Sequence, residues 1–264
     1  MQEIEIFQVD VFTDRIFAGN PAAVCVLERW IDRSLLQNIA AENNQSETAF
    51  IVAAAKGFEI RWFAPRAEVE LCGHATLAAA FVVTEYLQPG LTTVKFYSAM
   101  HELNVRKIQA RWEMDFPRLT YVAIALPEEA IEGLGVRASE AYEGNGTLVL
   151  LVENSKILAE AQPNLTFMKD RKIFLSLTCA ADPGENIDFV SRFFAPSVGV
   201  DEDSATGSVH CLLGPLWSTK LAKNHLHARQ LSKRGGSLSL EVTEQRVFIS
   251  GQAVLYLRGR ISLS

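Results

Sequence analysis

Short runs of alternating hydrophobic and polar residues fill most of the chain, which indicates strands rather than long helices. Two segments differ, because residues 75–86 and 208–216 are apolar on nearly every side. A helix of that kind has to be buried all round. Since the flanking segments read as strands, we expect each helix to lie inside a curled or barrel-like sheet. The expected strands are 4–12, 22–27, 48–52, 58–63, 91–97, 101–107, 110–116, 146–152, 173–178, 192–196, 228–232, 237–242, 245–250 and 252–260.

One ordinary amphipathic helix is also predicted, from Asp32 to about Asn43. Leu35, Leu36 and Ile39 give it one apolar face, and Asp32 is of a residue type that caps helix N-termini.

A five-residue motif occurs twice, as Arg-aromatic-Phe-Ala-Pro at 61–65 and again 131 residues later at 192–196. Each copy precedes an acidic stretch and a small-residue turn that opens one of the two apolar helices. We therefore predict an α+β fold of two pseudo-symmetric halves, each a β-barrel-like mixed sheet around a central helix. The halves would span 1–114 and 115–252, with the two turns facing one cleft. The segment 253–264 is expected as the last strand, and it could join the first half.

Composition and charge exclude several classes of protein. The 264 residues carry a net charge of −6 without a basic run, which argues against nucleic-acid binding. No apolar run reaches the ~18 residues of a membrane span, and the acidic, alternating N-terminus is unlike a signal peptide, so we expect a cytoplasmic protein. The four scattered cysteines favour free thiols over a disulfide framework or a zinc site: Cys25, Cys72, Cys179 and Cys211.

The two helix-opening turns are the first candidates for chemistry. Gly73 and Gly207 stand where the unpaired amides of a helix start attract carboxylates or phosphates. A lone glycine there usually makes only a turn, but the duplication favours a function. Ser208 could donate a hydrogen bond to a ligand or cap the helix.

Titratable residues near these turns have open roles. We expect His74 to be a neutral imidazole, because a helix N-terminus disfavours its cation. Asp203 either caps the second helix or faces the cleft, and Glu202 is expected to be solvent-facing or structural. Glu47 lies at an exposed strand edge, or else in a cleft where burial raises its pKa and suits it to acid/base work. Cys72, which the 131-residue offset aligns with Asp203, could be a nucleophile or base with a lowered pKa.

Together these residues resemble the PhzF-like (phenazine biosynthesis F) proteins in order and spacing over nearly the whole chain. The motifs are Val9–Thr13, Phe17–Ala22, Ser46–Phe50, Phe63–Pro65 with Cys72–Thr76, Glu202–Asp203 with Thr206–Ser208, Arg234–Gly236 and Ile249–Ala253. The resemblance implies a diaminopimelate epimerase-like fold and a cofactor-independent isomerase, typically a homodimer.

The resemblance also assigns roles to residues. It implies that Glu47 moves a proton between carbons of the substrate, assisted by His74 and Asp203. Asn20, Gly73, Gly207 and Ser208 would bind a small carboxylate substrate, without cofactor or metal. Two departures stand out: Ser204 replaces the family's proline, and the second half lacks the cysteine of the two-thiol epimerases. The alternatives are a catalytically silent binding protein on the same fold and an epimerase that uses Cys72.

Overall fold

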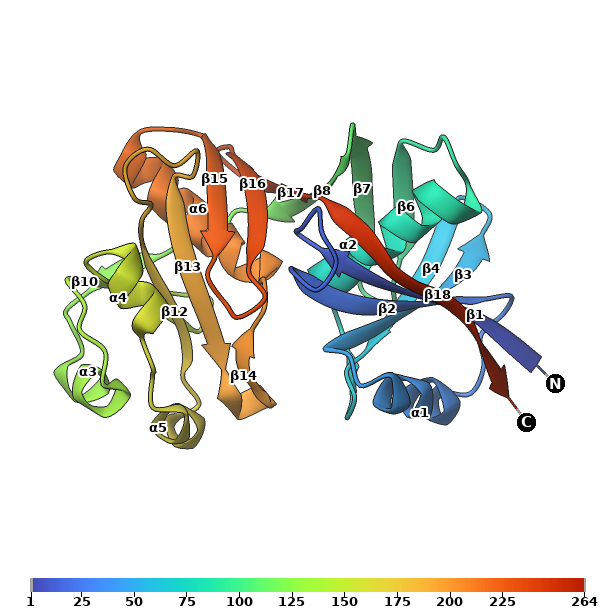
Figure 1. Cartoon of the computed structure of the whole chain (residues 1–264), viewed down its shortest axis with the longest axis horizontal. Helices are drawn as coiled ribbons and strands as arrows, with labels where there is room; N and C mark the ends of the chain where they lie inside the picture. The colour runs from blue at the N-terminus through green and yellow to red at the C-terminus, as the bar shows by residue number, and fades with distance from the viewer. Residues whose placement is uncertain (1, 264) are drawn as a thin grey trace. The chain divides into compact units, whose positions relative to one another are not determined.

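The computed structural model describes residues 2–263, with the side chains of residues 3–128 and 131–263. The chain divides into two compact units: unit 1 is Met1–Asp115 with Ser250–Ser264, and unit 2 is Phe116–Ile249. In each unit a curved sheet surrounds a helix (Figure 1).

In unit 1 the sheet surrounds α2 (Gly73–Val82), in which every residue from His74 to Val82 is buried. A helix without a polar face is stable only when protein covers it on all sides. On the other face of the sheet, α1 (Arg33–Asn43) packs Leu36, Ile39 and Ala40 against Phe50 and Phe63. The strands are β1 (Gln2–Val11), β2 (Asn20–Leu27), β3 (Glu47–Ala54), β4 (Gly57–Phe63), β5 (Glu68–Val69), β6 (Thr93–Tyr97), β7 (Glu102–Ile108), β8 (Arg111–Pro117) and β18 (Ala253–Leu263), which pairs with β1.

Two helix ends in unit 1 differ from the prediction. Asp32 is the N-cap of α1, but its side chain makes no capping hydrogen bond. The regular part of α2 stops at Val82, and Val83–Leu87 continues as a π-helix. There the Thr84 hydroxyl donates to the Ala80 carbonyl (3.0 Å) and accepts from Trp112 Nε1 (3.0 Å). A hydroxyl that bonds back to the preceding turn competes with regular helical pairing, a feature that an apolar pattern does not reveal.

In unit 2 the central helix is α6 (Gly207–Leu221), which runs five residues beyond the predicted end at 216. It continues through Pro215, whose missing N–H leaves the Cys211 carbonyl without its usual helical partner. The backbone N–H of Leu119 donates to that carbonyl (3.2 Å), so the proline is tolerated. The strands are β9 (Val122–Ile124), β10 (Glu140–Gly144), β11 (Thr147–Leu151), β12 (Phe174–Ala180), β13 (Phe189–Ala195), β14 (Val200–Asp203), β15 (His225–Gln230), β16 (Gly236–Val242) and β17 (Arg246–Gly251).

Three short helices of unit 2 were not predicted: α3 (Glu128–Leu134), α4 (Ser155–Glu160) and α5 (Leu165–Arg171). Six or seven residues are too few to show helical periodicity. For α4 and α5 the sequence signal is instead the cap residue, because the Asn154 and Asn164 side chains accept from the amides of Ile157 (2.9 Å) and Phe167 (3.1 Å). The N-cap of α3 is Pro127, which makes no such bond.

Strand pairing shows that the two units repeat one plan. In unit 1, β2 pairs parallel with β3 and β4 pairs parallel with β6. In unit 2, β11 pairs parallel with β12 and β13 pairs parallel with β15. The predicted fold class, two α+β halves each wrapped around a helix, is confirmed.

The arginine of each repeated motif has a structural role. Arg61 Nε donates to Glu68 on β5 (2.6 Å), and Arg192 Nε donates to Glu202 on β14 (2.6 Å). Each guanidinium also lies over the phenylalanine two residues later, at 5.2 Å for Phe63 and 4.8 Å for Phe194. The motif therefore fastens a short strand to β4 or β13, and Glu202 is structural, as expected.

The alignment of Cys72 with Asp203 is wrong. Cys72 is the N-cap of α2, whereas the N-cap of α6 is Thr206. The second connection is longer, because a 3₁₀ turn (Pro196–Val198) and a four-residue β14 replace the two-residue β5. Cys72 thus corresponds to Thr206, and Ser208 takes the helical position that His74 has in unit 1.

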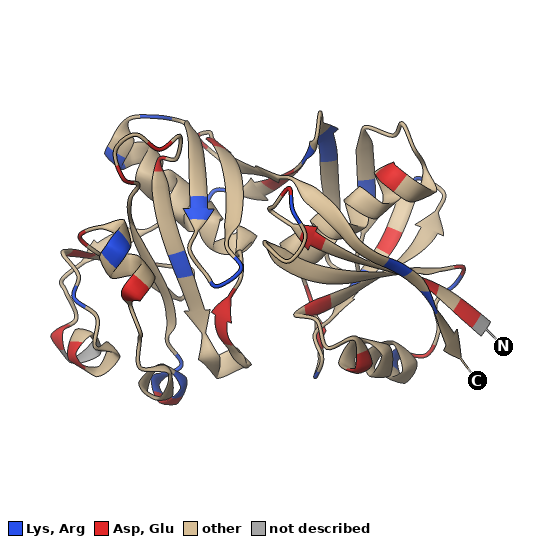
Figure 2. Cartoon of the chain, viewed as in Figure 1, with Lys and Arg blue, Asp and Glu red and all other residues tan. Residues whose placement is uncertain are grey.

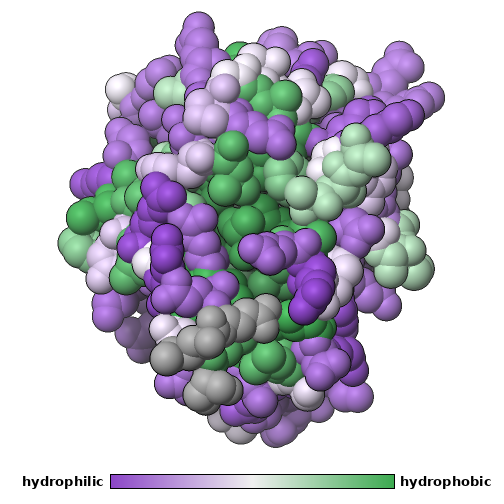
Figure 3. Space-filling view, turned by 90° about the vertical axis from the view of Figure 1, so that its right-hand side faces the viewer, coloured by the Kyte–Doolittle hydropathy of each residue, from purple (hydrophilic) through white to green (hydrophobic). Residues whose placement is uncertain are grey.

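The surface is mixed in charge and polarity. Acidic and basic residues are interspersed along both units in the view of Figure 2. On the face in Figure 3, apolar side chains form a band bordered by hydrophilic ones. Within residues 2–263, no helix has the length and apolar character needed to cross a membrane.

Candidate active site

Five polar residues of unit 1 come together at the start of α2: Asn20, Ser46, Glu47, Cys72 and His74. Asn20 is the first residue of β2 and Glu47 the first of β3, two parallel neighbours whose register aligns Ala22 with Glu47. Because the two strands are parallel, their first residues lie at the same end of the sheet. Because Cys72 caps α2 and Gly73 is its first residue, the helix start supplies the remaining groups.

The central contact joins His74 and Glu47. His74 Nε2 lies 3.1 Å from Glu47 Oε2, and only 10% of the His74 side chain and 21% of the Glu47 side chain are exposed. His74 Nε2 is also 3.2 Å from Ser46 Oγ. The Ser46 hydroxyl donates to the Pro21 carbonyl (3.1 Å) and lies 3.4 Å from Asn20 Oδ1. These contacts orient one imidazole edge towards a carboxylate, so Nε2 carries a proton that it donates.

Cys72 lies close to both nitrogens of the imidazole. Its Sγ is 3.5 Å from His74 Nδ1 and 4.0 Å from Nε2. Burial raises the pKa of the Cys72 thiol above its ordinary value, although His74 opposes that change. The residue is therefore a neutral thiol, and the expected lowering of its pKa by the helix start is wrong because burial outweighs it.

The expected direction of the Glu47 pKa is also wrong. Burial does favour the neutral acid, but hydrogen bonds from His74, Ser46 and Cys72 and the charge of His74 together lower the pKa of Glu47 below 4.5. Glu47 is therefore a carboxylate at neutral pH.

His74 is a cation rather than the expected neutral imidazole. Burial opposes the imidazolium, yet Cys72 and Glu47, which can both carry negative charge, raise the pKa of His74 well above 6.5. We assign the anion to Glu47, since burial keeps Cys72 protonated. A carboxylate at 3.1 Å favours the imidazolium more than the partial charge of the helix start opposes it.

The histidine titration gives a direct check of this ion pair. In NMR spectra of protein labelled at the imidazole nitrogens, His74 should titrate well above pH 6.5, and its midpoint should fall in Glu47→Gln. His210 is an internal control, because burial lowers its pKa to about 4 and its Nδ1 lies 2.7 Å from the Thr206 carbonyl in unit 2. A His74 midpoint at or below 6.5 in the wild-type protein would contradict the ion pair.

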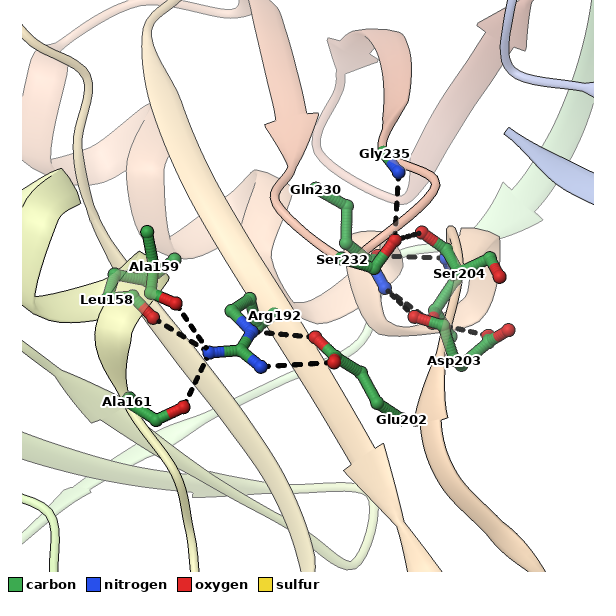
Figure 4. A network of polar contacts seen from close by, with 11 residues as sticks. Leu158, Ala159, Ala161, Arg192, Glu202, Asp203, Ser204, Gln230, Ser232 and Gly235 are labelled. Atoms are coloured by element: carbon green, nitrogen blue, oxygen red, sulfur yellow. Dashed lines mark hydrogen bonds and ion pairs between the residues drawn. The ribbon is translucent and has the colours of Figure 1, made fainter. Parts of the chain in front are cut away.

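In unit 2, Asp203 is the last residue of β14, and the turn that follows it is fixed by residues from outside it (Figure 4). Gln230 is fully buried and its Nε2 donates to the Asp203 carbonyl (2.7 Å), while its Oε1 accepts from the Thr206 amide (2.9 Å). The Thr206 hydroxyl donates to the Asp203 carboxylate. Ser232 Oγ donates to the Ser204 carbonyl (2.6 Å), a backbone contact that the family's proline would also allow.

The predicted site residues thus form two groups. Asn20, Glu47, Gly73 and His74 meet in unit 1. Asp203, Gly207 and the exposed Ser208 lie together at the start of α6 in unit 2, and their action on the same substrate stays a prediction. Sequence reasoning missed Ser46 and Gln230 as site-forming residues; Ser46 had a signal, since it directly precedes Glu47.

Comparison with known proteins settles the family. Residues 9–259 match the family model of the phenazine biosynthesis-like proteins, PhzC-PhzF. The chain belongs to this PhzC-PhzF family. It is 42% identical to an uncharacterized isomerase of Pseudomonas aeruginosa, over 99% of this chain and all of that protein. The expectation of an enzyme of the isomerase class is confirmed at this level by the relative's name.

Solved structures agree with this family and its fold. A PhzF-family phenazine biosynthesis protein from Enterococcus faecalis superposes with a TM-score of 0.95 at 39% identity, covering 99% of this chain and all of that one. A hydroxyproline epimerase from Agrobacterium vitis shares the fold at a TM-score of 0.65 and 10% identity, covering 99% of this chain and 93% of that one. The PhzF-like resemblance is therefore confirmed.

A separate hollow of about 550 Å³ lies elsewhere on unit 1 of this PhzC-PhzF protein. It borders β4 and β5 and is lined in part by Trp30, Trp62 and Tyr97. None of the predicted site residues lines it, and it lacks the contact between a carboxylate and an imidazole that the Glu47 cluster has. We place the site at Glu47 and His74, because chemistry requires groups that can hold and move a proton.

Proposed function

We propose that the protein is a cofactor-independent isomerase that moves a proton between two carbons of a small carboxylate-bearing metabolite. The observation that carries the proposal is the buried contact of 3.1 Å between His74 Nε2 and Glu47 Oε2, with opposite shifts of the two pKa values. A carboxylate and an imidazolium in contact place a general base beside a general acid.

In the first proposed step, the Glu47 carboxylate takes a proton from a substrate carbon. The C–H bond breaks, an O–H bond forms on Glu47, and the electron pair delocalises into the substrate. His74 is then next to a neutral acid, so its N–H is free to donate to the substrate oxygen on which negative charge develops. In the second step Glu47 returns the proton to a different carbon, and the original charges are restored.

The lowered pKa of Glu47 restricts the substrate. A weak base removes a carbon-bound proton at a useful rate only when that C–H is itself acidified. We therefore propose a substrate whose labile C–H lies next to a carbonyl or carboxyl group, or is allylic to one. Asn20 and the amides near Gly73 would bind its polar groups, and Asp203 and Ser208 with the amides near Gly207 would hold its carboxylate.

Deuterium exchange tests the proposal even when the product has not been identified. The protein is incubated with candidate small acids in deuterated water, and loss of carbon-bound ¹H is followed by NMR. Exchange or isomerisation of at least one acid supports the proposal. Thermal stabilisation by small acids, with exchange of none of them, would instead favour a catalytically silent binding protein. The homodimer implied by the family is a separate prediction, for sedimentation to test.

The thiol provides a test against an epimerase mechanism. Cys72→Ser should keep the exchange rate within about tenfold of wild type, because a neutral buried thiol is not the base. Alkylating agents should likewise leave the rate nearly unchanged, since Cys72 is only 7% exposed. A loss in Cys72→Ser as large as that in Glu47→Gln would favour the epimerase that uses Cys72.

A further inference from the structure

We propose that Glu47, Cys72 and His74 also form a binding site for one Zn²⁺ ion. Their potential ligand atoms, a carboxylate oxygen, a thiol sulfur and an imidazole nitrogen, all lie within 4.8 Å of one another. Among the side chains of residues 3–128 and 131–263, no other group of three or more His, Cys, Asp and Glu residues comes this close. Sequence spacing gave no sign of the site, since Glu47 lies far upstream of the Cys72-Gly73-His74 segment.

The distances suit a single small ion. A tetrahedral zinc centre has bonds of about 2.0–2.3 Å to nitrogen, oxygen and sulfur, which separates ligand atoms by roughly 3.3–3.7 Å. His74 Nε2 lies 3.1 Å from Glu47 Oε2 and 4.0 Å from Cys72 Sγ. The third separation, between the Glu47 carboxylate oxygen and Cys72 Sγ, is at most 4.8 Å. Side-chain movements of about 1 Å or less would therefore place all three atoms at bonding distance from one ion.

Ligand chemistry favours Zn²⁺ over Mg²⁺ or Ca²⁺. Sulfur and imidazole ligands select zinc and related transition metals, whereas Mg²⁺ and Ca²⁺ require mainly oxygen ligands. Three protein ligands leave a fourth position for water, and the exposed part of the Glu47 side chain gives the ion a way in. Binding replaces the thiol proton of Cys72 and a proton of the His74 imidazolium, and both protons pass to the buffer.

Metal binding would have a functional consequence that rests on the proposed function. The ion would occupy the same carboxylate and imidazole atoms that move the proton, so the zinc-loaded protein should not exchange substrate protons. The binding claim stands without this step, because it can be measured in the absence of any substrate.

Cobalt provides the direct test. The reduced full-length protein is titrated with Co²⁺, and sulfur-to-cobalt charge-transfer absorption is recorded in the near ultraviolet. We expect a band that saturates at one Co²⁺ per chain, is displaced by Zn²⁺, and is lost in Cys72→Ser. Cys179→Ser is the matched control, since Cys179 is a buried free thiol of unit 2, and it should keep the band.

A second measurement protects the test against misfolding of one variant. Competition with a chelating dye should show that His74→Ala and Glu47→Gln each bind Zn²⁺ about 100-fold or more weakly, since even the loss of a residue that only supports a ligand costs 10–100-fold. No charge-transfer band in the wild-type protein, or an equal band in Cys72→Ser, would overturn the proposal. If zinc binds but exchange continues in the loaded protein, the metal site stands and the proposed role of Glu47 and His74 fails.

Discussion

Glu47→Gln is expected to slow proton exchange on the substrate by about 10²–10⁴-fold, the usual contribution of a general acid or base. Glutamine keeps the size and most hydrogen bonds of glutamate but cannot accept a proton from carbon. The variant should fold normally, because glutamine can still accept from His74 Nε2 at the site of the present 3.1 Å contact. Exchange rates by NMR and the melting temperature together separate a chemical from a structural effect.

Glu42→Gln is the matched control. Glu42 is an exposed residue of α1 in the same unit, and the same change of charge there should leave the exchange rate near that of wild type. If Glu47→Gln exchanges as fast as Glu42→Gln, Glu47 is not the base.

Arg192→Ala is expected to destabilise unit 2 by about 3–5 kcal/mol, the range for a buried ion pair that loses one partner. The Arg192 side chain is only 12% exposed. Its guanidinium donates to both Glu202 carboxylate oxygens (2.6 and 3.0 Å) and to three carbonyls, those of Leu158, Ala159 and Ala161 (Figure 4). Alanine would leave the partly buried Glu202 carboxylate without its guanidinium and would remove one donor from each of the three carbonyls. Urea denaturation would measure the resulting loss of stability.

Arg137→Ala provides the comparison, since Arg137 is an exposed arginine of the same unit. Its removal should change the free energy of unfolding by no more than about 0.5 kcal/mol. Equal losses in the two variants would show that the Arg192 network contributes nothing beyond an ordinary surface arginine.

The fold was largely predictable because its strongest signals are local. Two helices apolar on every side required a sheet around each, and the motif at Arg61 and Arg192 revealed the duplication. The short helices α4 and α5 escaped because their only signals are the caps Asn154 and Asn164. The alignment of Cys72 with Asp203 failed because it assumed a constant offset of 131 residues. The connection before α6 is longer than the one before α2, so the offset changes there.

The sequence allowed the residues of the site to be predicted, but not their charge states. Glu47 and His74 were assigned through the family motifs, and the structure brings them into contact. The directions of both pKa shifts depend on that contact, and it joins residues that are far apart in the sequence. The sequence reveals only the groups close to His74 along the chain, such as the amides of the helix start. Gln230, which holds Asp203 in place, gave no signal for the same reason.

Comparison of equivalent positions shows that the acid/base pair is present in unit 1 alone. Phe174 is the first residue of β12, the position that Glu47 has in β3. Ser208 has the helical position of His74. Both members of the Glu47–His74 ion pair are thus replaced in unit 2, so the duplicated scaffold holds its acid/base pair once.

The most direct test of the account is the pH dependence of proton exchange, which shows whether the active form of the protein is the one with a Glu47 carboxylate and a His74 imidazolium. Activity requires ionised Glu47, whose pKa lies below 4.5, and protonated His74, whose pKa lies well above 6.5. The rate should therefore be flat from about pH 4.5 to 6.5 and beyond, fall in acid as Glu47 is protonated, and fall in alkali only as His74 loses its proton. A rate that instead rises steadily between pH 4.5 and 6.5, or that falls around pH 6.5, would show that the active form is not carboxylate with imidazolium.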